Sequence, residues 1–219
     1  MSEKKEKVKP TKLEKRFKRW RRLYACCRWL MPVKKYGHKE PYNNGSYVIV
    51  GNHKSGLDII PAALATDKPV RFMAKKDLFE RGIIKKLCES MEVIPVSRDG
   101  NDVRAVMQAM KALKNSEIIA IYPEGTRNKT DEIFLPFKSG ATMLSIKTRS
   151  PIIPVVHAKK MKLFHRAHVI YGEPLEFAEF YDKKPTEEDI KKCDEILRGE
   201  MLKLHARLLE ETAKKKKNK

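Results

Sequence analysis

The sequence contains no hydrophobic run long enough to cross a membrane. A spanning helix needs about 20 mostly apolar residues in succession, and none of the 219 residues lies in such a stretch. The N-terminal segment also lacks the apolar stretch and cleavage site of a secretory signal. These absences argue against a spanning or secreted protein. We therefore expect any contact with a membrane to be made at the membrane surface.

Cysteine is scarce and poorly spaced for cross-linking or metal binding. The four cysteines include an adjacent pair and show no C-x-x-C spacing: Cys26, Cys27, Cys88 and Cys193. Neighbouring cysteines make a poor disulfide framework, so we expect a reducing, cytosolic compartment. His165 and His168 form an H-x-x-H pair, but a metal site needs further ligands in a defined geometry. The sequence therefore predicts no metal site.

Three common catalytic signatures are missing. There is no G-x-G-x-x-G stretch and no Walker loop, which disfavours a nucleotide-binding enzyme. There is also no G-x-S-x-G elbow, the turn that exposes the nucleophile of many serine hydrolases. A hydroxyl that reacts at this protein is therefore expected to belong to a substrate.

Acidic residues are few relative to basic ones. The chain has 48 Lys and Arg against 28 Asp and Glu, a formal net charge of +20. Such a field attracts nucleic acid, an anionic membrane or a phosphorylated substrate. The basic residues are densest at the ends, in residues 1–39 and in the closing KKKKNK. A nucleic-acid-binding protein needs basic and aromatic residues interleaved on its core, so no specific nucleic-acid partner is expected.

The rest of the composition supports a folded α/β core. Hydrophobic residues make up 41% of the chain, enough to exclude a disordered polycation. Continuous apolar runs, typical of strands covered on both faces, alternate with helical patterns. This order predicts an α/β fold with a mostly parallel or mixed sheet flanked by helices. The expected strands are residues 46–50, 70–74, 92–96, 117–122, 151–157 and 168–172.

Two helices are predicted from apolar spacing between and after these strands. Residues 101–113 carry apolar side chains at intervals of three and four: Val103, Val106, Met107, Met110 and Leu113. A final helix is expected from Thr186 to about Thr212, because Thr186 and Asp189 have the spacing of a capping box. Its apolar stripe is expected to pack on the sheet: Ile190, Cys193, Ile196, Leu197, Met201, Leu204 and Leu208.

The N-terminal helix, expected over residues 11–31, has a different character. Lys and Arg surround one apolar stripe: Leu13, Phe17, Trp20, Leu23, Tyr24, Cys27, Leu30 and Met31. The high density of basic residues favours an amphipathic helix lying in an anionic membrane interface. The alternative is a helix docked on the core with a solvated basic face.

A cluster of polar residues follows the first predicted strand. In the stretch GNHKSGLDIIP, His53 precedes Asp58 by five residues. Ligands of open α/β sheets bind beyond the carboxyl ends of the strands. There a neutral imidazole can take a proton from a hydroxyl, while a carboxylate on its other nitrogen sets the tautomer. In a simpler interpretation, Ser55 and Asp58 only cap a helix.

A second cluster, IYPEGTRN, follows the strand expected at residues 117–122. Pro123 and Gly125 favour a turn from which Glu124 and Arg127 project. The planar guanidinium of Arg127 suits a phosphate group. The alternative interpretation is a surface salt bridge across the turn.

A third cluster, FMAKKDLF, places Lys75 and Lys76 directly after another predicted strand. In their order, the blocks NHKSGLD, FMAKKDLF, YPEGTRN with FLPFKSGA, and PIIPVV resemble the four motif blocks of the PlsC-type glycerolipid acyltransferases. The similarity is greatest to the 1-acyl-glycerol-3-phosphate (lysophosphatidate) acyltransferases and covers about residues 46–157. His-x4-Asp and E-G-T-R in this order are highly specific as a set.

The sequence departs from the family pattern at two places. A proline and then a glycine usually follow LF in the second block, whereas Gly82 and Lys85 stand there in this chain. The alignment therefore leaves Lys75 and Lys76 as alternatives for a phosphate contact. The third block often begins with Phe, and here Tyr122 takes that place.

The resemblance implies an α/β sandwich around a seven-stranded sheet, together with residue roles. His53 would be the general base and Asp58 its orienting partner. Glu124, Gly125, Thr126 and Arg127 would form the glycerol-phosphate site, with Lys75 as a further phosphate contact. No metal and no cofactor would be needed.

The resemblance also implies a reaction. A fatty acyl group would pass from an acyl thioester, either acyl-CoA or acyl-carrier protein, to the sn-2 hydroxyl of lysophosphatidate, giving phosphatidate. Another lysophospholipid or glycerol-3-phosphate is an alternative acceptor. We expect a basic N-terminal segment (1–40), a single acyltransferase domain (41–212) and a basic disordered tail (213–219). The chain would lie at the cytoplasmic face of an anionic membrane as a peripheral or monotopic protein.

Overall fold

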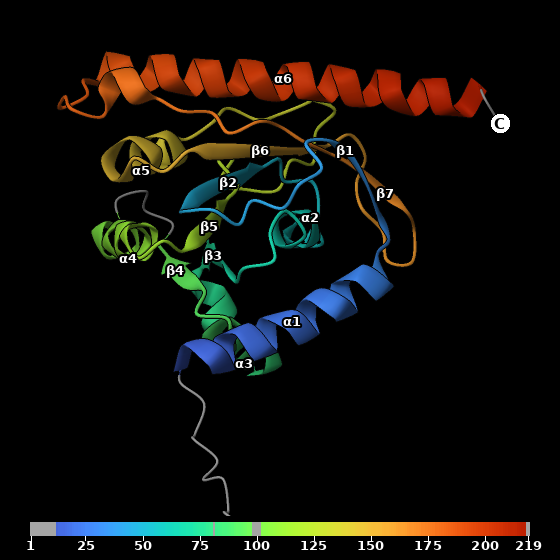
Figure 1. Cartoon of the computed structure of the whole chain (residues 1–219), viewed down its shortest axis with the longest axis horizontal. Helices are drawn as coiled ribbons and strands as arrows, with labels where there is room; N and C mark the ends of the chain where they lie inside the picture. The colour runs from blue at the N-terminus through green and yellow to red at the C-terminus, as the bar shows by residue number, and fades with distance from the viewer. Residues whose placement is uncertain (1–11, 81, 98–101, 218–219) are drawn as a thin grey trace, which may run out of the picture.

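A single seven-stranded sheet organises the protein, whose computed structural model describes residues 12–80, 82–97 and 102–217 (Figure 1). The strands are β1 (Val33–Gly37), β2 (Tyr47–Gly51), β3 (Val70–Lys75), β4 (Ile94–Val96), β5 (Ile118–Ile121), β6 (Ile152–His157) and β7 (Ala167–Tyr171). They lie in the order β1-β7-β6-β2-β5-β3-β4. All neighbours are parallel except β6 and β7, which are antiparallel.

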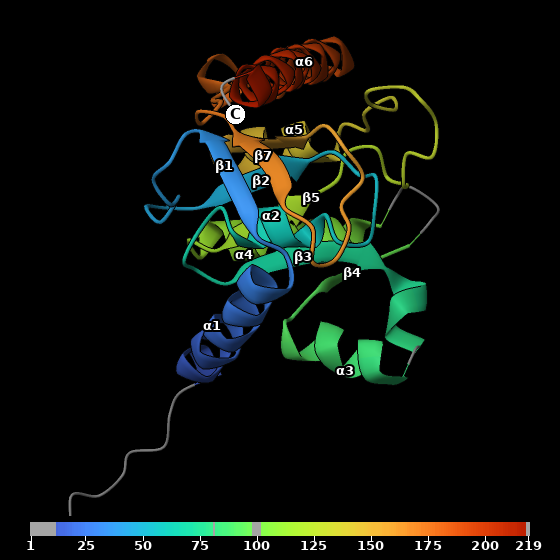
Figure 2. The same cartoon turned by 90° about the vertical axis from the view of Figure 1, so that its right-hand side faces the viewer.

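Helices cover both faces of this sheet (Figures 1 and 2). The α-helices are α1 (Lys12–Leu30), α2 (Ile59–Ala63), α3 (Gly82–Ser90), α4 (Val103–Lys114), α5 (Gly140–Thr148) and α6 (Glu187–Lys217). Two short 3-10 helices are η1 (Lys76–Glu80) and η2 (Ala178–Phe180). Helix α6 runs along one side of the molecule, and α1 and α3 lie on the opposite side.

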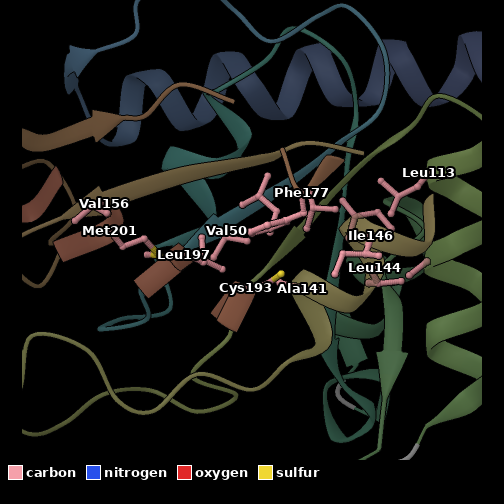
Figure 3. Packing of buried hydrophobic residues seen from close by; sticks show 14 of the residues in the cluster. Val50, Leu113, Ala141, Leu144, Ile146, Val156, Phe177, Cys193, Leu197 and Met201 are labelled. Atoms are coloured by element: carbon pink, nitrogen blue, oxygen red, sulfur yellow. The ribbon is translucent and has the colours of Figure 1, made fainter. Parts of the chain in front are cut away.

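The strands are apolar on both sides because each face of the sheet has its own core. In one core, Val50 and Val156 pack with residues of α4, α5 and α6, including Leu113, Leu144 and Leu197 (Figure 3). In the other, alternate strand residues such as Ile49, Ile153 and Val169 pack with residues of α1 and α2. The alternation follows from the period of two along a strand.

All six strands predicted from the sequence are confirmed, and the seventh strand is β1. Its sequence, VKKYG, has two lysines and little apolar character, so the sequence analysis placed it in the basic N-terminal segment. In the structure β1 pairs in parallel with β7, and Tyr36 is buried. Residues 33–37 therefore contribute an edge strand to the sheet.

Helix α1 forms where the sequence analysis expects it, although residue 11 lies outside the described part of the chain. Its apolar stripe, however, is largely used by the core. Trp20, Cys27 and Met31 are buried against the second core, and Leu23 and Tyr24 pack beside them. These side chains are therefore not available to enter a membrane. Over the described ranges, no helix is long and apolar enough to span one.

The other two predicted helices differ from expectation in detail. In α4 the buried residues are mainly alanines, while Val103 and Met107 are 67% and 65% exposed. The helix packs closely on the sheet through small residues. A pattern based on large apolar side chains does not reveal them. The capping box of α6 is confirmed, since the Thr186 hydroxyl accepts from the amide of Asp189 (3.1 Å). Helix α6 runs on to Lys217, so residues 213–217 are helical and not a disordered tail.

Candidate active site

His53 and Asp58 meet just beyond the carboxyl end of β2. His53 Nδ1 lies 2.9 Å from Asp58 Oδ2, and the side chains are 21% and 1% exposed. Because a carboxylate only accepts hydrogen bonds, Nδ1 carries a proton, and in the neutral ring Nε2 keeps its lone pair. Among the described residues no hydrogen-bond partner of Nε2 is found. The partly exposed ring can therefore receive a proton at Nε2.

The Asp58 carboxylate folds back onto the residues that precede it. Its Oδ2 accepts from the amides of Lys54 and Ser55, both at 2.7 Å, and its Oδ1 accepts from the Ser55 hydroxyl at 2.8 Å. Helix α2 begins directly afterwards, without a side-chain cap from Asp58. The contact that capping spacing predicts, from the Ser55 amide to Asp58, is present, but Asp58 does not only stabilise the start of a helix because it also binds His53. The sequence between His53 and Asp58 instead forms a tight loop around the carboxylate.

Asp58 is ionised despite its burial. Burial by itself would raise the pKa of this carboxyl, but hydrogen bonds from His157, His53 and the Ser55 amide outweigh it and hold the pKa well below its ordinary value. A permanently charged carboxylate can orient the His53 ring and stabilise the imidazolium that forms when Nε2 takes a proton.

The predicted second cluster holds the main chain of His53 from both sides. The His53 amide donates to Glu124 Oε1, and the Asn128 amide donates to the His53 carbonyl, each at 2.6 Å. The other Glu124 oxygen accepts from the amide of Leu135 at 3.0 Å. Glu124 is buried. Both of its oxygens thus bind protein amides, and its visible role is to fix the backbone that carries His53.

Helix α6 extends this support from the far side of the loop. Arg198 donates to the carbonyls of Leu135 (2.9 Å) and Phe134 (3.1 Å). The Leu135 amide in turn binds Glu124. A chain of contacts therefore links α6 to the main chain of His53.

Tyr122, at the start of the same cluster, packs directly on the candidate base. Its ring stacks on the His53 ring with centroids 4.7 Å apart. Its hydroxyl donates to the main-chain carbonyl of Asp58 at 2.7 Å, a bond that phenylalanine at this place could not make. The ring fits against β2 because residue 51 is glycine; a Cβ there would lie 2.9 Å from it.

The turn of the second cluster presents cationic groups beside the pair. Gly125 adopts a positive φ of 64°, which favours glycine, and the side chain of Lys138 lies against it. Thr126 and Arg127 are exposed. The Arg127 guanidinium lies over Gly56, where an added Cβ would be 3.3 Å from Nη2. Arg127 and the loop from His53 to Asp58 are thus brought together.

Lys75 lies on the same rim of the sheet but farther from the pair. It ends β3, which is parallel to β5, and its side chain is exposed. Lys76 instead approaches Asp102, with Nζ 3.5 Å from Oδ2. Of the two alternatives, Lys75 is therefore the more open to a ligand. In the described chain, no contact joins it to His53 or Asp58.

Two neighbours of the pair were not named as site residues in the sequence analysis. Asn128 was quoted within YPEGTRN without a role. His157, at the carboxyl end of β6, lies 3.3 Å from Asp58 Oδ1 through its Nε2. A polar residue at the end of an apolar strand, the signal that pointed to His53, could have pointed to His157. Within the described ranges, no group of three or more His, Cys, Asp or Glu is placed to hold a metal.

The fold and the site together define a class of enzyme. A histidine held by a buried carboxylate, at a sheet rim with an exposed arginine, can take a proton from a hydroxyl near an anionic group. The sequence model of the Acyltransferase family matches residues 32–158. This range includes all the site residues described above except Arg198, which lies in α6. The chain belongs to this family, and it is an acyl-transferring enzyme.

Similar proteins carry a more specific name. A "1-acyl-sn-glycerol-3-phosphate acyltransferase" of Bacillus subtilis is 28% identical over 80% of this chain and 89% of its own length. A protein of the same name from Helicobacter pylori is 33% identical over 62% of this chain and 55% of its own length. The solved 1-acyl-sn-glycerophosphate acyltransferase PlsC of Thermotoga maritima matches with a TM-score of 0.61 over 92% of this chain and 80% of its own. At 22% identity, that likeness shows the fold alone.

Proposed function

We propose that the chain transfers a fatty acyl group from an acyl thioester to the sn-2 hydroxyl of lysophosphatidate, forming phosphatidate. The observation that carries this proposal is the His53–Asp58 pair, placed at the sheet rim beside Arg127. The names of the relatives from Bacillus subtilis and Helicobacter pylori support lysophosphatidate as the acceptor. Acyl-CoA and acyl-carrier protein are the candidate donors, and another lysophospholipid or glycerol-3-phosphate is an alternative acceptor.

The proposed reaction proceeds by direct attack. Nε2 of His53 takes the proton of the acceptor hydroxyl as its oxygen bonds to the thioester carbonyl. The tetrahedral intermediate collapses, the C–S bond breaks, and the departing thiolate takes the proton from the His53 imidazolium. The products are the acylated lipid and the free thiol of the carrier. Asp58 keeps the ring oriented throughout and stabilises the imidazolium.

The catalytic pair is tested by two substitutions. His53→Ala removes the base and should abolish transfer, while Asp58→Asn removes the orienting charge and should lower kcat on the order of 10³-fold to 10⁴-fold. Turnover is measured with purified protein, both donors and lysophosphatidate. His165→Ala, an exposed histidine outside the site, serves as the matched control and should behave as wild type. Near-normal turnover of a folded His53→Ala protein would refute the mechanism.

Arg127 is proposed to bind the phosphate of the acceptor, with Lys75 as a further contact on the same rim. Arg127→Lys keeps the charge but loses the planar fork that binds two phosphate oxygens. The acceptor KM should rise about tenfold or more, by the 1.5–3 kcal/mol of a charged hydrogen bond, with the donor KM little changed. Initial rates with each substrate varied in turn measure the two constants. A change confined to the donor KM would assign Arg127 to the thioester.

An anionic membrane surface is the proposed place of reaction. The basic residues of α1 that have described side chains face outward. Near its carboxyl end Trp29 is 74% exposed and packs edge-on against Phe164, with ring centroids 5.9 Å apart. Aromatic rings beside basic residues suit the headgroup region of a bilayer.

Vesicle binding tests this proposal. The protein should co-sediment with phosphatidylglycerol vesicles at low salt and dissociate as salt screens the charges. Replacing exposed Lys15, Lys18 and Arg22 with Glu should weaken binding strongly, since each basic residue near an anionic surface contributes about 1 kcal/mol. Deleting α1 is a poor test, because the deletion also removes Trp20 from the core. Equal binding to neutral vesicles would contradict an electrostatic attachment.

A further inference from the structure

His157 is a second histidine on the Asp58 carboxylate. Its Nε2 lies 3.3 Å from Asp58 Oδ1, on the side of the carboxylate opposite the oxygen that faces His53. The His157 side chain is only 3% exposed. A buried polar ring in contact with an essential carboxylate affects that carboxylate directly, since little water intervenes.

The surroundings of His157 hold its main chain and ring in place. Its amide donates to Asn52 Oδ1 (3.1 Å), and its carbonyl accepts from Asn52 Nδ2 (3.0 Å). Asn52 is itself buried. It lies next to His53, directly after β2, and β2 pairs in parallel with β6. The residue that follows β2 and the last residue of β6 are thereby tied together.

Both ring nitrogens of His157 face acceptors. Nδ1 is 3.0 Å from the Lys159 carbonyl, and Nε2 is 3.2 Å from the Asn52 carbonyl as well as near Asp58. A neutral imidazole would leave one lone pair pointing at an oxygen, whereas a ring with two N–H groups satisfies every contact. The geometry therefore favours an imidazolium.

We propose that His157 is a positioning residue which, as an imidazolium, holds the Asp58 carboxylate in place and shares its negative charge with His53. With part of that charge neutralised, Asp58 orients the His53 ring but stabilises its protonated form less strongly. The kinetic consequences of this inference rest on the proposed acyl transfer, whereas the contact between His157 and Asp58 does not depend on it.

Other charged and titratable groups around the pair come from three elements. The β2–α2 loop contributes Lys54, the segment after β5 contributes Tyr122, Glu124 and Arg127, and α6 contributes His205. Burial, followed by the charges of Lys54 and His157, lowers the pKa of His205. The neutral form of His205 is therefore favoured, and of these two histidines His157 is the one in contact with Asp58.

Two substitutions separate charge from packing. His157→Ala should lower kcat by about tenfold to a hundredfold, as loss of a supporting partner of a catalytic group does, with the acceptor KM unchanged. His157→Gln can still donate to Asp58 and should recover most of kcat. In both variants the acidic limb of the pH–kcat profile should move to higher pH, because Asp58 then stabilises protonated His53 more strongly. His165→Ala should leave the limb in place.

If kcat falls equally at every pH in both variants and the acidic limb does not move, His157 is a packing residue and the proposal is overturned. A substrate-free measurement keeps the test independent of the acceptor. Nitrogen-15 NMR of the wild-type imidazole rings at pH 7 should show His157 protonated at both nitrogens. One unprotonated His157 nitrogen would overturn the proposal even if transfer to lysophosphatidate is confirmed.

A separate observation concerns α3, which projects from the body on the same side as α1 (Figure 2). Its outward face is apolar: Ile83 is 87% exposed, and Ile84 and Leu87 lie at matching helical positions and are also exposed. Lys85 and Lys86 are exposed beside them. An apolar helix face next to lysines complements an anionic lipid surface.

We infer that α3 is the element whose apolar side chains enter the anionic membrane proposed above, while α1 contributes charge. The apolar stripe of α1 is engaged with the core, so α3 takes the role that the sequence pattern assigned to α1. Both helices lie on one side of the molecule and can approach a single lipid surface together.

The test compares two pairs of exposed apolar residues. Ile83→Asp with Leu87→Asp should weaken binding to phosphatidylglycerol vesicles about tenfold or more, because two apolar side chains no longer leave water. Val103→Asp with Met107→Asp, which changes two exposed apolar residues of α4, should leave binding unchanged. Activity on detergent-dispersed substrate should be equal in both variants. Unchanged vesicle binding of the α3 variant overturns this inference alone, whereas wild-type protein that ignores the vesicles overturns the membrane proposal as well.

Discussion

The buried Asp58 carboxylate is the constraint on which the site depends. A charge removed from water must be hydrogen-bonded, and here the donors are the Lys54 and Ser55 amides, the Ser55 hydroxyl and two histidine rings. These donors come from two strand ends, which can supply them only if the sheet places β2 beside β6. The strand order and the shape of the loop after β2 thus both serve one carboxylate.

The two-sided core explains how the sheet achieves this. Strands that are apolar on both faces are stable only between two helical layers, so β2, β5 and β6 lie at the centre with helices on either side. Parallel pairing then brings the ends of β2 and β5 to one rim. Arg127, from the β5 side, consequently lies over Gly56, from the β2 side. Rigid strands carry the site, and the loops need only a few residues to complete it.

Elements with strong local signals were predictable from sequence. Six strands, the capping box of α6 and the helix at the N-terminus follow from runs, spacing and caps that depend on near neighbours in the chain. The His-x4-Asp and E-G-T-R blocks were equally visible, because their residues are adjacent in sequence. Strand β1 was missed because an edge strand with two lysines lacks the apolar run that identifies a central strand. The buried face of α4 was not predicted, because it consists mainly of alanines while Val103 and Met107 are exposed.

By itself the sequence determined the class of fold and the candidate base with its carboxylate, since both rest on local patterns. Only the tertiary structure decided which groups those residues meet. Glu124 turned out to bind the main chain of His53, and Trp20 turned out to belong to the core, because burial depends on what the rest of the chain brings alongside. His157 reaches Asp58 from 99 positions away in the sequence. No local pattern encodes that contact, because it exists only where the parallel ends of β2 and β6 lie side by side.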